Sequence, residues 1–464
     1  MTTPVLFIVI PSIMALGLFF LRGKPRFSIT ISMVLYLFLG FLALFQNFGV
    51  VTKIGEVSVD IGTTLILFGR NLVLSNSDRY FLFLSCISIL LTMGGIQYLR
   101  LKVNVIPYLM LILASLTAAV AVEPFLYSSI FVEIAVLFSL PILIHPKSPL
   151  LKGVLRFLLY QSLAMPMILI GGWFISGTQS SPSDLQQLGV AGFFLATGFA
   201  FWLAVFPFHS WVPLLIEDVH PHIFTFLLAL IPQAILFLIL DFTNSISWIR
   251  ESDQFYTILF FTGLIMVVTT GIWGLFEKRL TRYIAYIILF ETGSLLMLSG
   301  LQSYATSLAY YLSMFPRLIG ILLIGFCLSV IISSDNQSIR DFTSVGRTYP
   351  FASSGLIIAL FSLVGFPLLG EFPYKYILLS SIGEYRPQML PWVIVGMTLV
   401  IIPVFLLLMK VFSRNNQNVK IQESIPQILI ICSGVFLLLL TGIYPQILEL
   451  IFSQLIKYLP VTGL

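Results

Sequence analysis

The sequence predicts an all-α polytopic membrane protein with about 14 transmembrane helices. Of its 464 residues, 58% are hydrophobic and only 9% are charged, whereas roughly 25% are charged in an average soluble protein. The mean hydropathy is +1.04. Apolar runs close to the roughly 20 residues needed to cross a bilayer follow one another along the chain. A water-soluble core could not absorb this much apolar surface.

The predicted spans are joined by short connections. They cover residues 4–21, 28–48, 79–98, 105–122, 125–144, 154–175, 188–206, 222–240, 255–275, 283–300, 305–332, 351–382, 391–411 and 427–446. The longest gap, Gly49 to Asp78, alternates polar and apolar residues and predicts a small hairpin or a surface helix. The first run has no basic residues before it, which favours a retained helix over a signal peptide. We therefore expect a single transmembrane domain over residues 1–464.

Basic residues give an independent check on this helix count. Loops that follow odd-numbered spans carry sixteen Lys and Arg residues, and the opposite set, with the tail, carries six. Cytoplasmic loops are the ones enriched in Lys and Arg. The asymmetry predicts that both termini lie outside. Because the basic residues cluster between apolar runs, the net charge of +5 indicates topology signals in a lipid bilayer and no nucleic-acid partner.

Several kinds of chemistry find no support in the sequence. Cys86, Cys327 and Cys432 all lie in apolar runs without a CxxC pair, so neither a disulfide nor a metal site is expected. There is no GxxxxGK phosphate loop and no GxGxxG after a strand. ATP-driven transport and hydride chemistry within this chain are therefore not expected. No ligand set for flavin, haem or an iron–sulfur cluster is present, so we expect no cofactor in this chain.

Four ionisable residues fall inside predicted spans and are candidates for a proton or ion pathway: Glu133, Glu291, Arg317 and Lys375. A charge at mid-bilayer costs about 2.5–3.5 kcal/mol on insertion scales, so each requires a reason. Structural roles stay open for all four. A glutamate can be kept neutral and bonded to a neighbouring helix, Arg317 can bind carbonyls freed by Pro316, and Lys375 can extend to the interface.

The surroundings of Lys375 are the most specific of the four. Gly365, Pro367, Gly370 and Pro373 interrupt an otherwise apolar run, so a continuous helix would lose several backbone hydrogen bonds there. Broken helices at membrane depth are tolerated where they are buried or line a polar cavity. A lysine beside such a break can exchange a proton.

A polar segment joins the seventh and eighth spans, and we expect an interfacial polar loop there. It contains His209, Glu217, Asp218, His220 and His222. Three readings stay open: a metal site, a surface for proton uptake or release, and a structural turn, which is expected at a membrane face in any case.

Several motifs together resemble the antiporter-like membrane subunits of proton-pumping NADH:quinone oxidoreductase (complex I), a family shared with Mrp-type cation/proton antiporters and membrane-bound hydrogenases. The resemblance covers roughly residues 75–410. PFHSWVP at 207–213 is similar to the family's PFHxWLP. The supporting matches are Glu133; Ala285, Tyr286 and Gly293; and Gly365, Pro367, Gly370, Phe372 and Lys375.

This resemblance implies fourteen helices, broken seventh and twelfth helices, and two inverted five-helix repeats at about 105–240 and 255–411. It further implies a membrane-arm subunit of a complex I-like energy-converting complex that takes part in proton translocation or structurally supports it. Other membrane subunits would be its partners. The expected location is a bacterial inner membrane or an organellar energy-transducing membrane.

The departures from the family pattern bear on that function. Trp202 occupies the place of the seventh-helix lysine that pairs with the fifth-helix glutamate in the family, and Gln233 or Ala234 occupies the place of the eighth-helix lysine. Ser313 stands where a histidine commonly precedes a basic residue by four, and Arg317 holds the basic place. Tryptophan, glutamine and arginine do not exchange protons near neutral pH. The charged axis is therefore degenerate, and two alternatives remain: a subunit of an Mrp-type cation/proton antiporter, and a non-pumping scaffold subunit.

Overall fold

The structure is a computed structural model. It describes residues 2–20, 25–49, 52–54, 57–59, 62–67, 69–99, 101, 103–144, 151–176, 185–332, 342–411 and 421–459.

Ten helices of the described chain are long and apolar enough to cross a membrane. They are α2 (Pro25–Phe45), α3 (Arg79–Tyr98), α5 (Ser128–Leu143, with the preceding turn Phe125–Tyr127), α6 (Lys152–Ser176), α9 (Pro221–Ser245), α11 (Asp253–Phe276), α12 (Leu280–Ser299), α13 (Tyr304–Ile332), α17 (Leu390–Val411) and α18 (Ile425–Ile443). Each coincides with one predicted span. The chain is an integral membrane protein with an all-α membrane domain.

The other helices are shorter. They are α1 (Ile10–Phe20), α4 (Ile106–Ala121), α7 (Leu185–Trp202), α8 (Trp211–Asp218), α10 (Ser247–Arg250), α14 (Phe342–Thr348), α15 (Pro350–Val364), α16 (Phe372–Tyr385) and α19 (Gln446–Ile456). The four remaining predicted spans contain α1, α4, α7 and the pair α15 and α16. The number of fourteen crossings stays a prediction, because these four are the shorter helices. The sequence did not predict α8 or α19 as separate helices.

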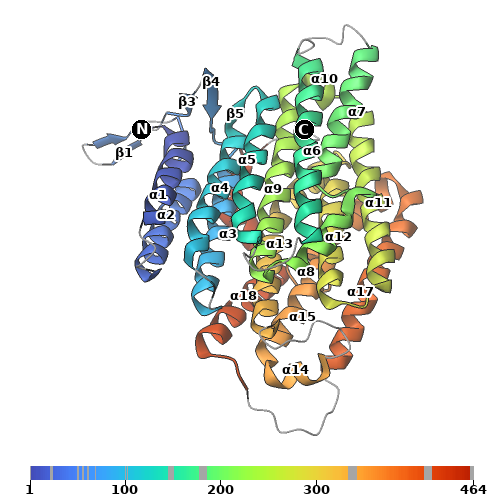
Figure 1. Ribbon diagram of the computed structural model, residues 1–464. Coiled ribbons are helices and arrows are strands. Elements are labelled where there is room, and N and C mark those ends of the chain that lie inside the picture. Colours follow the sequence, from blue (N-terminus) through green and yellow to red (C-terminus); the bar gives the residue numbers. More distant parts are fainter. Residues whose placement is uncertain are drawn as a thin grey trace.

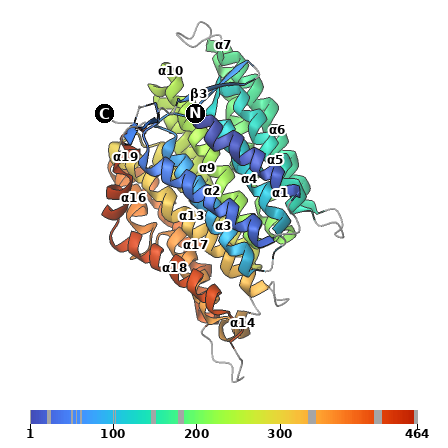
Figure 2. The same cartoon turned by 90° about the vertical axis from the view of Figure 1, so that its left-hand side faces the viewer.

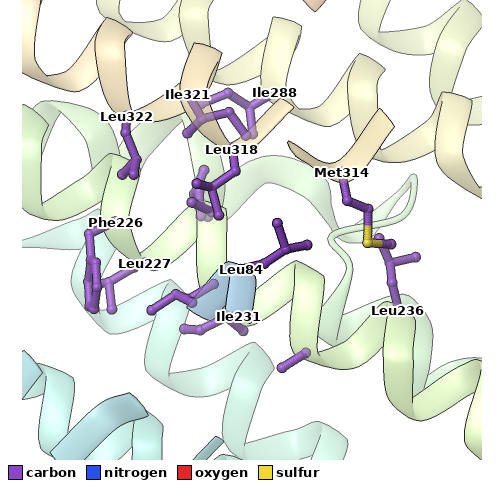
Figure 3. Packing of buried hydrophobic residues seen from close by; sticks show 14 of the residues in the cluster. Leu84, Phe226, Leu227, Ile231, Leu236, Ile288, Met314, Leu318, Ile321 and Leu322 are labelled. Atoms are coloured by element: carbon purple, nitrogen blue, oxygen red, sulfur yellow. The ribbon is translucent and has the colours of Figure 1, made fainter. Parts of the chain in front are cut away.

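Helix α9 forms the centre of the bundle (Figure 1). Within its most apolar window 94% of the residues are buried, against 17% in α18, so α9 packs against protein while α18 presents most of its surface to lipid. Leu84 of α3, Ile231 of α9 and Leu318 of α13 meet in the core beside α9 (Figure 3). Helices α1 and α2 lie on the outer face of the bundle (Figure 2).

A small sheet covers one end of the bundle. Strands β3 (Thr64–Leu67), β4 (Arg70–Val73) and β5 (Val122–Glu123) pair antiparallel in that order, and β1 (Thr52–Ile54) pairs with β2 (Val57–Val59). The gap between the second and third spans thus forms hairpins, one of the two predicted outcomes. We call this the sheet end of the molecule.

Both ends of the described chain lie at the sheet end. Thr2 bridges to Gly62 beside β3. At the other terminus, the ring of Phe452 in α19 lies 5.1 Å from that of Tyr80 in the first turn of α3, next to the sheet. The predicted location of the two termini on one side of the membrane agrees with this arrangement.

Two helices are broken within the bundle, as the family resemblance implies. Helix α7 ends at Trp202, and the chain resumes as a helix at Trp211. Helix α15 ends at Val364, and α16 begins at Phe372. Each break falls in the fourth helix of a predicted repeat. In the first repeat the broken helix follows α4, α5 and α6, and in the second it follows α11, α12 and α13. The repeat boundaries themselves stay predictions.

Glycines allow α11 to pack closely against α12. A Cβ atom on Gly263 of α11 would collide with the carbonyl oxygen of Gly293 in α12, and one on Gly293 would lie 3.0 Å from the carbonyl oxygen of Gly263. Small residues let helix backbones approach in membranes, where van der Waals packing drives association. This contact fixes the position of α12, which carries Glu291.

We expect Gly263→Ala to lower the free energy of unfolding by about 1–3 kcal/mol, because an added methyl in a well-packed contact forces the backbones apart. Thermal unfolding in detergent micelles, followed by tryptophan fluorescence, measures the change. Gly17→Ala is the matched control, because nothing lies within 4 Å of a Cβ at that position. An equal effect at the two glycines would show that the close approach is unimportant.

Candidate functional site

Two of the predicted pathway residues form a buried ion pair. Glu291 lies in the middle of α12 and Lys375 in the first turn of α16. The Nζ atom of Lys375 lies 2.6 Å from Oε2 of Glu291, and their side chains are 3% and 0% exposed. The same Nζ atom lies 5.2 Å from the centre of the Phe290 ring, which adds a cation–π contact.

The break between α15 and α16 positions Lys375 for this pair. Gly365 ends α15 in the left-handed conformation at φ +87°, where its N–H donates to the carbonyls of Phe361 and Ser362. A Cβ at position 365 would lie 2.5 Å from Cγ of Lys375. A glycine is therefore required both for the backbone conformation and for the space that the lysine stem occupies.

Two further charges complete the site. Arg317 of α13 and Glu371, directly before α16, are both fully buried. Arg317 interacts electrostatically with Glu291 and with Glu371, and Glu371 also interacts with Glu291 and Lys375. We call Glu291, Arg317, Glu371 and Lys375 the charge quartet. With both acids ionised and both bases protonated, its formal charges cancel.

Sequence reasoning missed Glu371. It lies in the GEFPYK stretch of the predicted break. Its position could have identified it, because a carboxyl four residues before a lysine, at the first turn of the helix after a break, lies close to that lysine. The three pathway residues predicted in this half of the chain, Glu291, Arg317 and Lys375, come together around it.

The quartet keeps polar atoms that have no direct partner. Among the described residues, the three guanidinium nitrogens of Arg317 have no hydrogen-bond partner, and the Glu371 carboxyl meets only that of Glu291 within hydrogen-bonding range. Buried charges are normally paired and hydrogen-bonded, because desolvation otherwise costs several kcal/mol. Groups of this kind are sites where ordered water is expected to bind.

Glu133 lies apart from the quartet, on α5 in the other half of the chain. Ser162 of α6 donates to its Oε1 at 2.6 Å, and its Oε2 has no partner among the described residues. The neighbouring Gln161 donates to the backbone oxygen of Trp202 at 3.4 Å, and Trp202 is 1% exposed. In the part of the chain that is described, Glu133 has a hydroxyl neighbour and no ion pair.

The other departure from the family pattern is also buried. Gln233 is fully buried on α9, and neither its amide nitrogen nor its amide oxygen has a partner in the described chain. Ser313 on α13 is 1% exposed and donates to the backbone oxygen of Tyr310 at 2.9 Å. Polar but non-titrating groups therefore occupy the interior between the two halves.

The predicted interfacial polar loop has structural partners. Glu217 accepts hydrogen bonds from Arg279 and, at 2.7 Å, from Arg282. Asp218 accepts one from the backbone N–H of Gly153, at the start of α6. The two acids thus tie α8 to α12 and α6.

The histidines of this loop also contact neighbouring residues. A ring nitrogen of His222 lies 2.9 Å from the carbonyl oxygen of Thr92, and the ring of His209 stacks on that of Phe206. Burial lowers the pKa of His220 to about 4, so this side chain is neutral at pH 7. Within the described residues, no three His, Cys, Asp or Glu side chains are grouped to hold a metal ion. These contacts are compatible with a structural turn, and a role in proton uptake or release stays a prediction.

Residues 175–403 match the model of the NADH:quinone oxidoreductase/Mrp antiporter transmembrane family. This part of the chain is similar to the antiporter-like membrane domain of that family. The whole charge quartet lies within this antiporter-like domain, whereas Glu133 lies before it. The resemblance inferred from the motifs is confirmed.

Relatives of the antiporter-like domain include NADH-quinone oxidoreductase subunit N of Pelagibacter ubique, 27% identical over 271 residues, which are 54% of this chain and 55% of that protein. The match thus spans about half the length of this relative. The chain also resembles a subunit in the structure of the Mrp complex from Dietzia sp., with TM-score 0.82 and 13% identity over 98% of this chain and 97% of the other. A chain of respiratory complex I from Thermus thermophilus gives TM-score 0.77 and 16% identity over 97% of each chain. These two structures establish the fold.

We expect Lys375→Met to lower the free energy of unfolding by about 3–5 kcal/mol, because it leaves Glu291 buried without its partner. Glu291→Gln should destabilise for the same reason. The double variant should lose less free energy of unfolding than the two single variants added together, because neither charge of the pair remains buried without its partner. Unfolding of all three in detergent micelles measures the coupling. Lys278→Met, at an exposed lysine, is the control, and strictly additive losses would rule out the pair as a stabilising unit.

Proposed function

We propose that this chain is a membrane-arm subunit of a complex I-like energy-converting complex and that its charge quartet takes part in proton translocation. The observation that supports this most directly is the buried ion pair of Lys375 and Glu291 beside a helix break. Relatives named as NADH-quinone oxidoreductase subunits, such as the one from Pelagibacter ubique, support the same assignment.

The quartet has the chemistry for a proton step. Arg317 stays protonated at all ordinary pH values, so it supplies a fixed positive charge. Lys375, Glu291 and Glu371 can each gain or lose a proton. A proton that reaches a carboxylate of the quartet removes one negative charge and weakens the electrostatic attraction that keeps Lys375 protonated. Lys375 is then able to release its own proton. The quartet returns to neutrality when one proton has left.

The orientation and the partners follow from the charge distribution and the family. Loops that follow odd-numbered predicted spans carry most of the Lys and Arg residues, which supports a cytoplasmic or equivalent face for those loops and both termini outside. Other membrane subunits would supply the electron-transfer chemistry, since we assign no redox cofactor to this chain. Its location would be a bacterial inner membrane or an organellar energy-transducing membrane.

Two alternatives have support of their own. The fold likeness to the Mrp complex subunit, with TM-score 0.82, favours a cation/proton antiporter subunit. Buried Trp202 and Gln233, at places where the family carries lysines, favour a scaffold subunit that does not pump.

Gentle solubilisation of the native membrane, pull-down of the full chain and mass spectrometry separate the complex I-like subunit from the antiporter subunit. Quinone-site and iron–sulfur subunits would support our proposal, and recovery with antiporter subunits alone would overturn it.

Lys375→Arg separates a pumping subunit from a scaffold. Arginine keeps the positive charge beside Glu291 but does not release a proton near neutral pH. We expect the variant complex to assemble and to lose at least about tenfold in proton translocation, the low end of what a positioned acid–base group contributes. Translocation by the purified complex in proteoliposomes, read with a pH-sensitive dye, measures this. A fully active Lys375→Arg complex would leave the scaffold role as the better account.

A further inference from the structure

A cavity opens at the sheet end, next to the C-terminal end of α9, whereas the predicted loop of histidines precedes the N-terminal end of that helix. Its volume is about 600 Å³. Polar side chains line it from β4, the turn before α3, β5 and the last turns of α9: Asn71, Ser75, Ser77, Asp78, Glu123 and Asp241. Space of this size with several polar partners is suited to a group of water molecules.

Asp241 is the acid that α9 contributes to this cavity, and no sequence motif pointed to it. It lies on α9 one turn beyond Phe237 and two turns beyond Gln233, so the three residues form one stripe along the helix. The ring of Phe237 lies 6.2 Å from that of Tyr311 on α13. This stripe therefore faces α13, the helix that carries Arg317.

Tyr310 connects Asp241 with the charge quartet. It is 2% exposed, its ring packs edge-on against Tyr311 at 5.2 Å, and it interacts electrostatically with both Arg317 and Asp241. Tyr310 and Arg317 are separated by seven residues, which places them on the same face of α13. A phenol accepts a hydrogen bond on one side and donates its own on the other, so it can pass a proton without becoming ionised.

We propose that the cavity, Asp241 and Tyr310 form the access route for protons between the sheet end and the charge quartet, with ordered water completing the steps. This inference rests on the proposed function. In each release a proton from the quartet moves onto the Tyr310 oxygen while the hydroxyl proton of Tyr310 passes to the Asp241 carboxylate, and Asp241 then gives one proton to cavity water. Tyr310 and Asp241 are thereby returned to their starting protonation states. Glu133 is not part of this route.

A second acid of the cavity, Asp78, is suited to proton uptake and release. Asp78 accepts hydrogen bonds from the backbone and hydroxyl groups of Ser75 at 2.7 and 3.1 Å. Burial nevertheless raises the pKa of Asp78, and the nearby Glu123 raises it further. An acid of this kind exchanges protons closer to neutral pH than an exposed aspartate does.

The first test uses the complete complex in proteoliposomes. We expect Asp241→Asn and Tyr310→Phe each to lower proton translocation by at least about tenfold, since each keeps the side-chain size and removes the exchangeable group. The matched controls are Asp253→Asn, an exposed acid at the same end, and Tyr36→Phe, a buried tyrosine on α2. Both should translocate at the wild-type rate.

The outcomes separate this route from the proposed function. If Asp241→Asn and Tyr310→Phe pump normally while Lys375→Arg is inactive, the route is overturned and the function of the quartet stands. If Lys375→Arg also pumps normally, the proposed function falls, and the route falls with it.

A second measurement does not depend on transport or on the acid variants. Leu238 lines the cavity one turn before Phe242, so Leu238→Cys, in a background where Cys86, Cys327 and Cys432 are alanine, reports access of water. We expect a membrane-impermeant maleimide to label it from the sheet end only. An unlabelled cysteine, or one labelled from the opposite face, would overturn the route. Ile231→Cys, fully buried on the same helix, should remain unlabelled.

Discussion

The four buried ionisable side chains of the charge quartet constrain the rest of this structure. Moving each ion out of water costs several kcal/mol of desolvation free energy. This cost is offset only where opposite charges meet with good geometry. Lys375 reaches Glu291 because α15 stops at Gly365 and because α11 holds α12 in place through paired glycines. The helix break, the glycine at φ +87° and the small-residue contact therefore serve a single electrostatic arrangement.

The two halves of the bundle use their broken helices differently. In the second half the break brings a lysine to two carboxylates and an arginine. In the first half the break follows Trp202, and Glu133 has only the hydroxyl of Ser162 as a hydrogen-bond partner among the described residues. An aromatic ring at this place fills space without adding a titrating group. We infer that ion chemistry is concentrated in the second half, while the first half supplies packing around α9.

Much of the fold could be predicted from the sequence, since span length and hydropathy are local properties and Gly and Pro mark the breaks. Glu291, Arg317 and Lys375 were identified one by one, because a charge in an apolar run is conspicuous. Their pairing was not predictable, because it depends on how α12, α13 and α16 pack. Glu371 and Asp241 were missed because each lies at a helix end, where an acid is ordinary in sequence and its burial shows only in three dimensions.

Buried polar atoms without a direct hydrogen-bond partner mark the positions where this chain is less stable than an apolar core would be. Gln233, Arg317 and Glu371 are fully buried, yet each keeps polar atoms without a direct partner among the described residues. Apolar residues of similar volume would often be neutral or stabilising at such positions. The three lie on α9, α13 and the break before α16, which are the elements between the sheet-end cavity and the Glu291–Lys375 pair. Polar groups retained at this cost are better explained by hydration and charge movement than by packing, since packing alone would favour their loss.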